Sequence, residues 1–303
     1  RLTLAQLDQA AQAGSEALVG WLAALEGNRA VVVDAERPQQ LAALGAAVEA
    51  LRGRKRFLFR SAASLLNGLV EGAGRPLGPQ PLDATDLAAL RRCEATGQAL
   101  PGLVLVGSHV PLADQQLAVL LAEERCVGIE LPVARIARVL EGGSPDLLLA
   151  DLERHWLEQL RTVLLSGRTP VLYTSRGELS FGGGEAAVAR RLRFGMELAR
   201  LMARLVRGLK ALPAPLLGYL ISKGGITTGT LLAEGLGLEA VHLEGQLLPG
   251  LSLVRPMPPA PRCWQDLPIV TFPGNLGEAG SLAAAWRLMA GSSGGAEAPG
   301  LPQ

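Results

Sequence analysis

Hydrophobic positions in the first 72 residues switch between helical and extended patterns. Apolar residues recur at a mostly helical spacing from Leu2 to Leu25, which predicts helix. The runs 30–33 and 57–59 are instead short and continuously apolar, as buried strands are, and a helical pattern follows each of them, over 38–51 and 62–70. This alternation of strand and helix favours a parallel sheet with helices on its faces.

A second and longer alternation begins after residue 100. Seven runs predict strands: Leu103–Val106, Val127–Leu131, Pro170–Tyr173, Leu217–Ile221, Ala240–Leu243, Leu251–Val254 and Ile269–Phe272. Four segments have helical spacing: Gln115–Glu123, Asp146–Leu165, Glu185–Leu209 and Ser281–Met289. The predicted fold class is therefore α/β, with two domains whose largely parallel sheets are flanked by helices.

Composition sets the expected domain boundaries. Gly, Pro, Gln and Asp cluster around 75–83, which predicts a linker over residues 73–100 between a domain at 1–72 and a domain at 101–291. Gly, Ser, Pro and Ala dominate residues 292–303, which predicts a disordered tail. Two domains also suit a chain of 303 residues.

Charge and cysteine content narrow the class of protein. The 29 Lys and Arg residues balance 28 Asp and Glu residues, so no basic excess suggests nucleic-acid binding. Charged residues or Gly interrupt every apolar stretch before the roughly 18 residues of a membrane-spanning helix, so no membrane association is expected. Cys93, Cys126 and Cys263 are widely spaced, and the first 25 residues do not resemble a secretory signal. These features predict a cytoplasmic protein with reduced thiols.

Glycine and small hydroxyl residues follow three of the predicted strands. These segments are Gly107-Ser108, Ser222 to Gly229 and Phe272 to Gly277. Glycine lets several backbone N–H groups converge on one anion, and Thr227 and Thr228 add hydroxyl groups where a helix is expected to begin. Ligands of open α/β sheets bind at the carboxyl ends of strands, so three such loops together predict an anion site, although any one of them alone is more often a tight turn.

The sequence does not identify the anion by motif. Neither GxxxxGK[ST] nor GxGxxG occurs after a first strand. The three histidines have no metal-ligand spacing, so no metal site made of protein histidines is expected, and His109 is best interpreted as a hydrogen-bonding loop residue. Lys223 is either a cation for phosphate or a solvated surface residue, and Arg176 either faces the cleft or pairs with Glu178.

Several motifs in this order resemble one family. They are Val106-Gly107-Ser108, Tyr173-Thr174-Ser175-Arg176, Ser222-Lys223-Gly224-Gly225-Ile226-Thr227-Thr228, Gly245-Gln246-Leu247-Leu248-Pro249-Gly250 and Phe272-Pro273-Gly274-Asn275-Leu276-Gly277. Together they closely resemble the C-terminal nucleotide-binding domain of the four-carbon acid sugar kinases, formerly a domain of unknown function. The segment Phe59-Arg60-Ser61-Ala62-Ala63-Ser64 and the run 31–34 are similar to the end of that family's N-terminal substrate domain.

This resemblance implies a cytoplasmic kinase that uses ATP and Mg²⁺ to phosphorylate a small sugar acid of the threonate, erythronate or 3-oxo-tetronate type. It implies that ATP contacts Ser108, Gly224, Gly225, Ile226, Thr227, Thr228, Gly274 and Asn275. It further implies that Gly245 and Gly250 shape the floor of the pocket. Residues 1–72 would be the C-terminal part of the sugar-acid-binding domain. Both a monomer and a homodimer remain open.

The sequence also departs from the family pattern. The family's Ala-Asp-Asp-x-Thr-Gly and Lys-x-Asp-Ser-Thr-x-Arg-Gly motifs are missing, and residues 111–116 lack the threonines usual there. We therefore expect the chain to start inside the substrate domain, and no catalytic base is identified. One alternative is a non-catalytic or regulatory nucleotide-binding remnant. A dinucleotide-dependent oxidoreductase is a weaker alternative, because the chain lacks GxGxxG.

Overall fold

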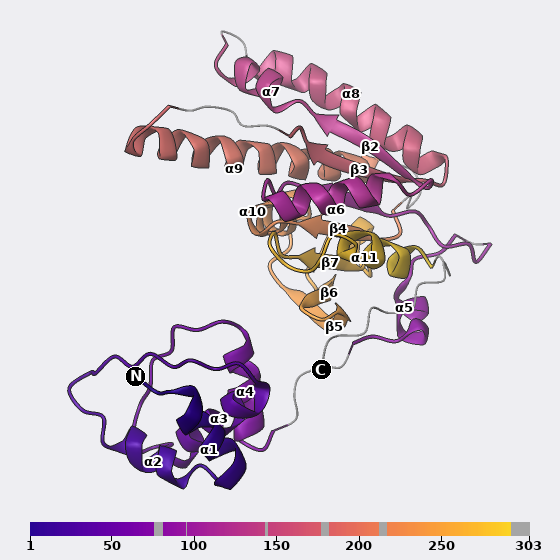
Figure 1. Cartoon of the computed structure of the whole chain (residues 1–303). Coiled ribbons are helices and arrows are strands. Elements are labelled where there is room, and N and C mark those ends of the chain that lie inside the picture. The colour runs from indigo at the N-terminus through magenta and orange to yellow at the C-terminus, as the bar shows by residue number, and fades with distance from the viewer. Residues whose placement is uncertain (76–80, 95, 143–144, 177–181, 212–216, 292–303) are drawn as a thin grey trace. The chain divides into compact units, whose positions relative to one another are not determined.

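A computed structural model describes residues 1–75, 81–94, 96–142, 145–176, 182–211 and 217–291 (Figure 1). By its internal contacts the chain divides into unit 1, residues 1–80, and unit 2, residues 81–303. Residues 81–90, which contain helix α5 (Ala84–Leu90), thus group with unit 2. The sequence-based boundaries, with a linker over 73–100, stay a prediction, and the predicted disordered tail lies outside the described residues.

Four helices form the core of unit 1: α1 (Leu4–Ala13), α2 (Glu16–Ala23), α3 (Pro38–Ala50) and α4 (Ser64–Gly72). Their buried side chains make one small cluster that includes Leu7, Leu22 and Leu44. Helices α3 and α4 approach closely because glycines face each other, and a Cβ atom at Gly45 would lie 2.1 Å from the carbonyl oxygen of Gly68.

The two strands predicted in unit 1 are not buried strands. A single parallel bridge joins Leu2 to Val33, and the described residues of 57–59 belong to no strand. Val32 is 63% exposed and Leu58 is fully exposed. A buried strand needs neighbouring strands for its backbone groups and a covering layer for its side chains. The described part of unit 1 provides neither for these two runs, so the prediction is wrong there.

Unit 2 is built on a seven-stranded sheet with the order β2-β3-β1-β4-β7-β6-β5. Its strands are β1 (Leu103–Val106), β2 (Cys126–Leu131), β3 (Thr169–Thr174), β4 (Leu220–Lys223), β5 (Val241–Leu248), β6 (Leu251–Pro256) and β7 (Ile269–Phe272). The first five strands in this order are parallel, whereas β6 and β5 run antiparallel at one edge. The α/β class with a largely parallel sheet is confirmed for this unit.

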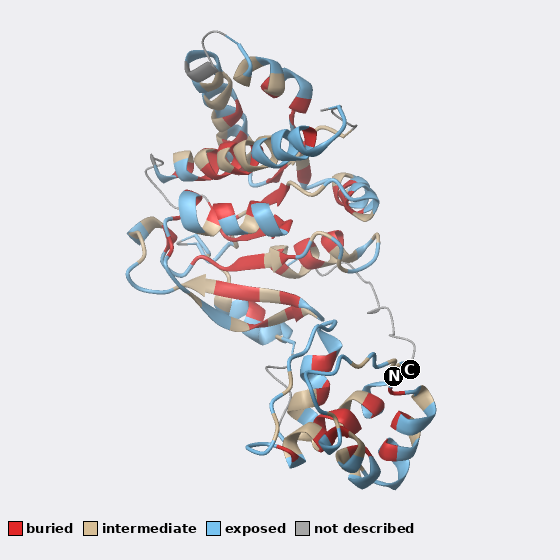
Figure 2. Ribbon diagram, turned by 90° about the vertical axis from the view of Figure 1, so that its left-hand side faces the viewer, coloured by how far each residue is buried: buried red, intermediate tan, exposed pale blue. Residues whose placement is uncertain are grey.

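Helices cover both faces of this sheet. They are α6 (Pro111–Leu121), α7 (Val133–Leu140), α8 (Pro145–Leu165), α9 (Glu185–Gly208), α10 (Gly225–Thr230) and α11 (Ser281–Ala290), with shorter turns at Leu209–Ala211, Leu231–Gly235 and Arg262–Trp264. Side chains of β1 alternate between two cores. Leu103 and Leu105 pack with α8 and α9, whereas Val104 and Val106 pack with α5, α6 and α11. Figure 2 shows the resulting layer of buried strands between helices with exposed outer faces.

Most predicted elements of unit 2 occur near their expected bounds, and β1 and β7 coincide with them. Strand β4 begins three residues later than predicted, at Leu220, and just before it Gly218 donates its N–H to Pro101 O at 2.7 Å. Helix α7 was not predicted, because it is only eight residues long and rich in Arg. Within the described residues, no helix is long and apolar enough to cross a membrane.

Candidate functional site

Three glycine-containing loops meet at one edge of the sheet, as predicted. Strands β1, β4 and β7 are parallel neighbours, and their last residues are in register: Val106 lies beside Lys223, and Lys223 beside Phe272. The backbone bonds continue past the strands. Gly107 N–H donates to Lys223 O at 3.2 Å, and Gly224 N–H donates to Phe272 O at 2.9 Å. The carboxyl ends of all three strands therefore open onto one site.

Ser108, Gly224, Thr227 and Gly274 lie against one another at this edge. A Cβ atom at Gly107 would lie 2.1 Å from Thr227 Oγ1, so this glycine makes room for the threonine. At Gly224, where φ is +117°, a Cβ would lie 3.5 Å from the Ser108 nitrogen. At Gly274 it would lie 3.0 Å from Ser108 Oγ. Gly107 leaves no room for a Cβ beside Thr227, Gly274 packs tightly on Ser108, and Gly224 has a backbone conformation that favours glycine.

Helix α10 starts directly from this contact. Its first N–H groups, at Gly225, Ile226 and Thr227, have no acceptor within the helix, and the first intrahelical bond runs from Thr228 N–H to Gly224 O at 2.9 Å. A Cβ at Gly225 would meet nothing within 4 Å, and Ile226 is 52% exposed. Thr228 Oγ1 is already engaged, since it donates to Ser222 O at 3.1 Å and to Ser222 Oγ at 2.9 Å. The backbone at Gly225 is thus the open part of the turn.

A buried glutamine fixes the loop after β7. Gln116 of α6 is fully buried, and its Nε2 donates to Leu276 O at 3.0 Å and to Glu278 O at 2.8 Å. Asn275 lies between these anchors and Gly274, and it is exposed. Our sequence reasoning missed Gln116. The available signal was a polar residue among the apolar positions of a predicted helix, which becomes informative once the loop carbonyls are known.

Lys223 is buried, so the interpretation as a solvated surface lysine is wrong. Its side chain is fully buried at the end of β4, and Nζ lies 4.1 Å from the centre of the Phe272 ring. Nζ donates to two carbonyl oxygens of the loop after β7, Pro273 O at 3.1 Å and Gly274 O at 3.2 Å. Burial lowers the pKa of Lys223 to about 8, because it disfavours the charged amine.

An arginine that follows β3 contacts the loop after β1. Arg176 donates from Nη1 to Ser108 O at 2.6 Å and forms an ion pair with Asp114 at 3.0 Å. His109 Nε2 lies 3.1 Å from Thr174 Oγ1, as expected for a hydrogen-bonding loop histidine. Burial, aided by the charge of Arg176, lowers the pKa of His109, which favours the neutral ring. The predicted alternative partner Glu178 lies outside the described residues.

The two glycines expected on the floor of the pocket occupy different places. Gly245 lies inside β5 opposite Leu253, and strands β6 and β7 separate β5 from β4. The structure does not bring Gly245 to the other predicted residues. Gly250 forms the tip of the β5–β6 hairpin with φ +78°, and a Cβ there would lie 2.9 Å from Leu276 Cδ2. The hairpin tip therefore contacts the loop that follows β7.

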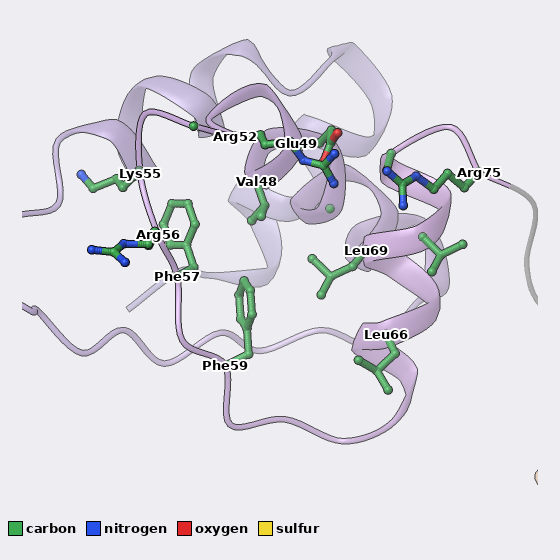
Figure 3. A pocket seen from close by; sticks show the side chains of 14 residues that line it. Val48, Glu49, Arg52, Lys55, Arg56, Phe57, Phe59, Leu66, Leu69 and Arg75 are labelled. Atoms are coloured by element: carbon green, nitrogen blue, oxygen red, sulfur yellow. The ribbon is translucent and has the colours of Figure 1, made fainter.

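Unit 1 contains a pocket of about 500 Å³ (Figure 3). Phe57 and Phe59, whose ring centres are 6.1 Å apart, line it together with Leu66 and Leu69 of α4. Cationic side chains also line it, namely Arg52, Lys55, Arg56 and Arg75. Glu49, another lining residue, is engaged by Arg52 at 3.1 Å. The lining thus combines an apolar surface with an excess of positive charge, which suits an anion.

Comparisons with known proteins agree with the division of the chain into units 1 and 2. A family model described as the nucleotide-binding C-terminal domain matches residues 103–282, which is more than half of the 303 residues. A model described as the sugar-binding N-terminal domain matches residues 1–69. No curated protein matches the chain significantly.

Two solved structures share the fold at low sequence identity. A Haemophilus influenzae protein of the DUF1537 family is 18% identical, with a TM-score of 0.51 over 95% of this chain and 60% of that one. A Salmonella typhimurium LT2 protein that carries the provisional name of a tRNA synthase is 21% identical, with a TM-score of 0.54 over 93% of this chain and 57% of that one. The chain thus spans about three fifths of each neighbour's length.

The order of the two matched domains agrees with the division into units 1 and 2. The chain belongs to the family that joins a sugar-binding N-terminal domain to a nucleotide-binding C-terminal domain, which is the architecture of the four-carbon acid sugar kinases.

Proposed function

We propose that this protein is an ATP-dependent kinase for a four-carbon acid sugar of the threonate, erythronate or 3-oxo-tetronate type. The observation that carries the proposal is the contact among Ser108, Gly224, Thr227 and Gly274 at the carboxyl ends of β1, β4 and β7, in a chain of this family. Glycines that admit a phosphate to the backbone, next to unpaired N–H groups, are the features that nucleotide phosphates need.

In this proposal the phosphates of ATP lie over the start of α10. The N–H groups at Gly225 and Ile226 and the hydroxyl of Ser108 donate hydrogen bonds to phosphate oxygens, and the charge of Lys223 lies beneath them. Phosphoryl transfer depends mainly on positioning and on neutralising the charge of the transferred group. Rigid loops with converging donors supply both. Gly274 and Asn275 contact the nucleotide from the loop after β7, and Gly245 would act only indirectly, through the β5–β6 hairpin.

Mg²⁺ fits this site as a partner of the phosphates. Among the described residues, no group of three or more His, Cys, Asp or Glu side chains is placed to hold a metal ion by itself. Mg²⁺ in phosphoryl-transfer enzymes usually retains water and takes one or two protein oxygens together with substrate phosphates. The Asp114 carboxylate and the Ser108 hydroxyl are oxygen donors of the required kind at this edge. Bound Mg²⁺ would neutralise charge on the phosphates.

The substrate class rests on the match of unit 1 to a sugar-binding domain. The positive charges around the unit 1 pocket suit the carboxylate of a sugar acid, and Arg is well shaped for bidentate binding of a carboxylate.

A second candidate is nucleotide binding without catalysis. One observation favours it: Leu58, an apolar residue of unit 1, is fully exposed. Unit 1 would then hold an incomplete substrate site. Nucleotide binding is common to both candidates, whereas turnover separates them.

One experiment addresses both candidates. Mg·ADP binding is measured by calorimetry, and Mg·ATP is then offered with threonate, erythronate and 3-oxo-tetronates while ADP release is followed. Release that requires one sugar acid supports the kinase. Saturable ADP binding with no turnover on any of them supports the non-catalytic alternative. Absence of nucleotide binding by the folded chain contradicts both.

A further inference from the structure

Lysine is rare in this chain and occurs in a particular setting. Only Lys55, Lys210 and Lys223 are lysines among the 29 cationic residues, and the others are arginines. Two of the three place Nζ on a pair of backbone carbonyls. Lys55 bonds to Ala23 O and Leu25 O, and Lys223 bonds to Pro273 O and Gly274 O. A compact ammonium can serve two converging carbonyls, whereas the planar guanidinium of arginine presents its donors in a fixed fork.

Lys223 differs from Lys55 in its surroundings. Lys55 is partly exposed and bonds to carbonyls at and after the end of α2, where the helix dipole favours a cation. Lys223 is fully buried, and no carboxylate among the described residues forms an ion pair with it. On the neighbouring elements, Asp114 is paired with Arg176, Glu278 is exposed, and His109 favours the neutral form. The described part of the protein therefore buries a cation without a negative partner.

The same ammonium holds the loop that completes the site. It binds the carbonyl of Gly274, the residue whose added Cβ would lie 3.0 Å from Ser108 Oγ and 4.0 Å from Gly224 Cα. Without these two hydrogen bonds, the Pro273–Gly274 turn would keep its contact with Ser108 only through packing. Lys223 thus both fixes the Pro273–Gly274 turn and supplies a charge beneath it, whereas Gln116 holds the loop farther along, at Leu276 and Glu278.

We propose that Lys223 is the positioning residue of the nucleotide site, which fixes the Pro273–Gly274 turn against Ser108 and Gly224 and whose missing counter-charge is the bound phosphate. This inference rests on the proposed nucleotide binding. It adds a specific prediction: the buried charge is retained for the ligand and destabilises the free protein.

The proposed role of Lys223 makes both nucleotide affinity and the stability of the free protein depend on pH. A nearby phosphate favours the ammonium, so binding raises the pKa of Lys223 above its value of about 8 in the free protein. Affinity is then unaffected by this group below pH 8 and falls by up to about tenfold per pH unit above it. Between pH 8 and 10.5 the unfolded chain retains the proton that the folded chain has lost, so the stability of the free protein rises with pH in that window.

The test compares Lys223→Met and Lys223→Arg with Lys210→Met, which removes an exposed lysine. Mg·ADP affinity is measured by calorimetry at pH 7 and pH 9, and melting temperature is measured without ligand. We expect Lys223→Met to weaken binding about 10- to 100-fold at pH 7. The melting temperature of Lys223→Met should equal or exceed that of the wild type. Lys210→Met should bind Mg·ADP more weakly at pH 9 than at pH 7, whereas Lys223→Met should not show this loss.

Lys223→Arg keeps its charge at pH 9, so it should also lose the pH dependence, at reduced affinity because the fork does not serve both carbonyls. Wild-type affinity in Lys223→Met overturns the role of Lys223 while the nucleotide site stands. A lower melting temperature together with the loss of binding also overturns it, because the residue is then simply structural. If the wild type and Lys210→Met both fail to bind Mg·ADP, the proposed function itself fails, and the positioning role fails with it.

Discussion

Units 1 and 2 contain similar apolar runs that have different structural outcomes. In unit 2, Leu103–Val106 is completely buried as β1 between two parallel neighbours. In unit 1, the run 57–59 leaves Leu58 fully exposed, although its sequence is at least as apolar. An apolar run becomes a buried strand only when neighbouring strands bond to its backbone and helices cover its faces. The candidate nucleotide site depends on that condition, because adjacent strands bring its loops together.

The largest expected effect is a difference in stability, and it appears when one leucine from each unit is replaced by alanine. Leu105→Ala removes a fully buried side chain from the centre of the sheet and should lower the free energy of unfolding of unit 2 by about 2–5 kcal/mol. Leu58→Ala removes a fully exposed one and should change stability by less than about 0.5 kcal/mol. Urea unfolding of both variants measures the difference. A large loss in Leu58→Ala would show that another surface covers this run in solution.

The next effect concerns the contact between the β1 loop and α10. Gly107→Val would force a Cβ to within 2.1 Å of Thr227 Oγ1, so it should cost about 1–3 kcal/mol and displace the turn that begins α10. Gly229→Ala is the control, since a Cβ there meets nothing within 4 Å, and it should stabilise the helix by about 0.5–1 kcal/mol. Thermal unfolding measures both. Equal melting temperatures would mean that the two loops are not in contact.

A smaller effect on stability and affinity is expected when the anchor of the loop after β7 is removed. Gln116→Leu removes the donor to Leu276 O and Glu278 O and should cost about 1–2 kcal/mol, with a parallel loss of Mg·ADP affinity. Gln159→Leu changes an exposed glutamine of α8 and should alter neither quantity measurably. Unfolding curves and calorimetry on both variants provide the comparison. A Gln116→Leu protein that keeps both its stability and its affinity would show that the loop needs no anchor.

Sequence reasoning located the candidate site but not all of the contacts within it. The runs Leu103–Val106 and Ile269–Phe272 are bounded by glycine-containing turns, so both their strand character and their following loops were predictable. The strand order β3-β1-β4-β7 explains why the loops meet, and order depends on packing between distant segments. For the same reason, Gln116 and the bonds of Arg176 to Ser108 and Asp114 were not predictable, since each links residues at least 60 positions apart.

Errors in the prediction have the same origin. Lys223 ends a strand beside glycine, where a surface position is common, but its register beside Phe272 and the covering helices bury it. The role of Gly245 at the nucleotide pocket stays a prediction, although β5 lies three places from β4 in the sheet. In unit 1, the runs 30–33 and 57–59 lack strand partners among the described residues, apart from the bridge of Val33 to Leu2, so the prediction of buried strands was wrong there.

We propose that the carboxyl ends of β1, β4 and β7 bind the phosphates of a nucleotide. Calorimetric titration with Mg·ADP of the wild type, Gly225→Val and Gly195→Val tests it most directly, because an added Cβ at either glycine meets nothing within 4 Å and both variants should fold. We predict saturable binding by the wild type and Gly195→Val, and at least tenfold weaker binding by Gly225→Val, whose side chain blocks the open backbone of the turn. Undiminished binding by a folded Gly225→Val protein would contradict the claim.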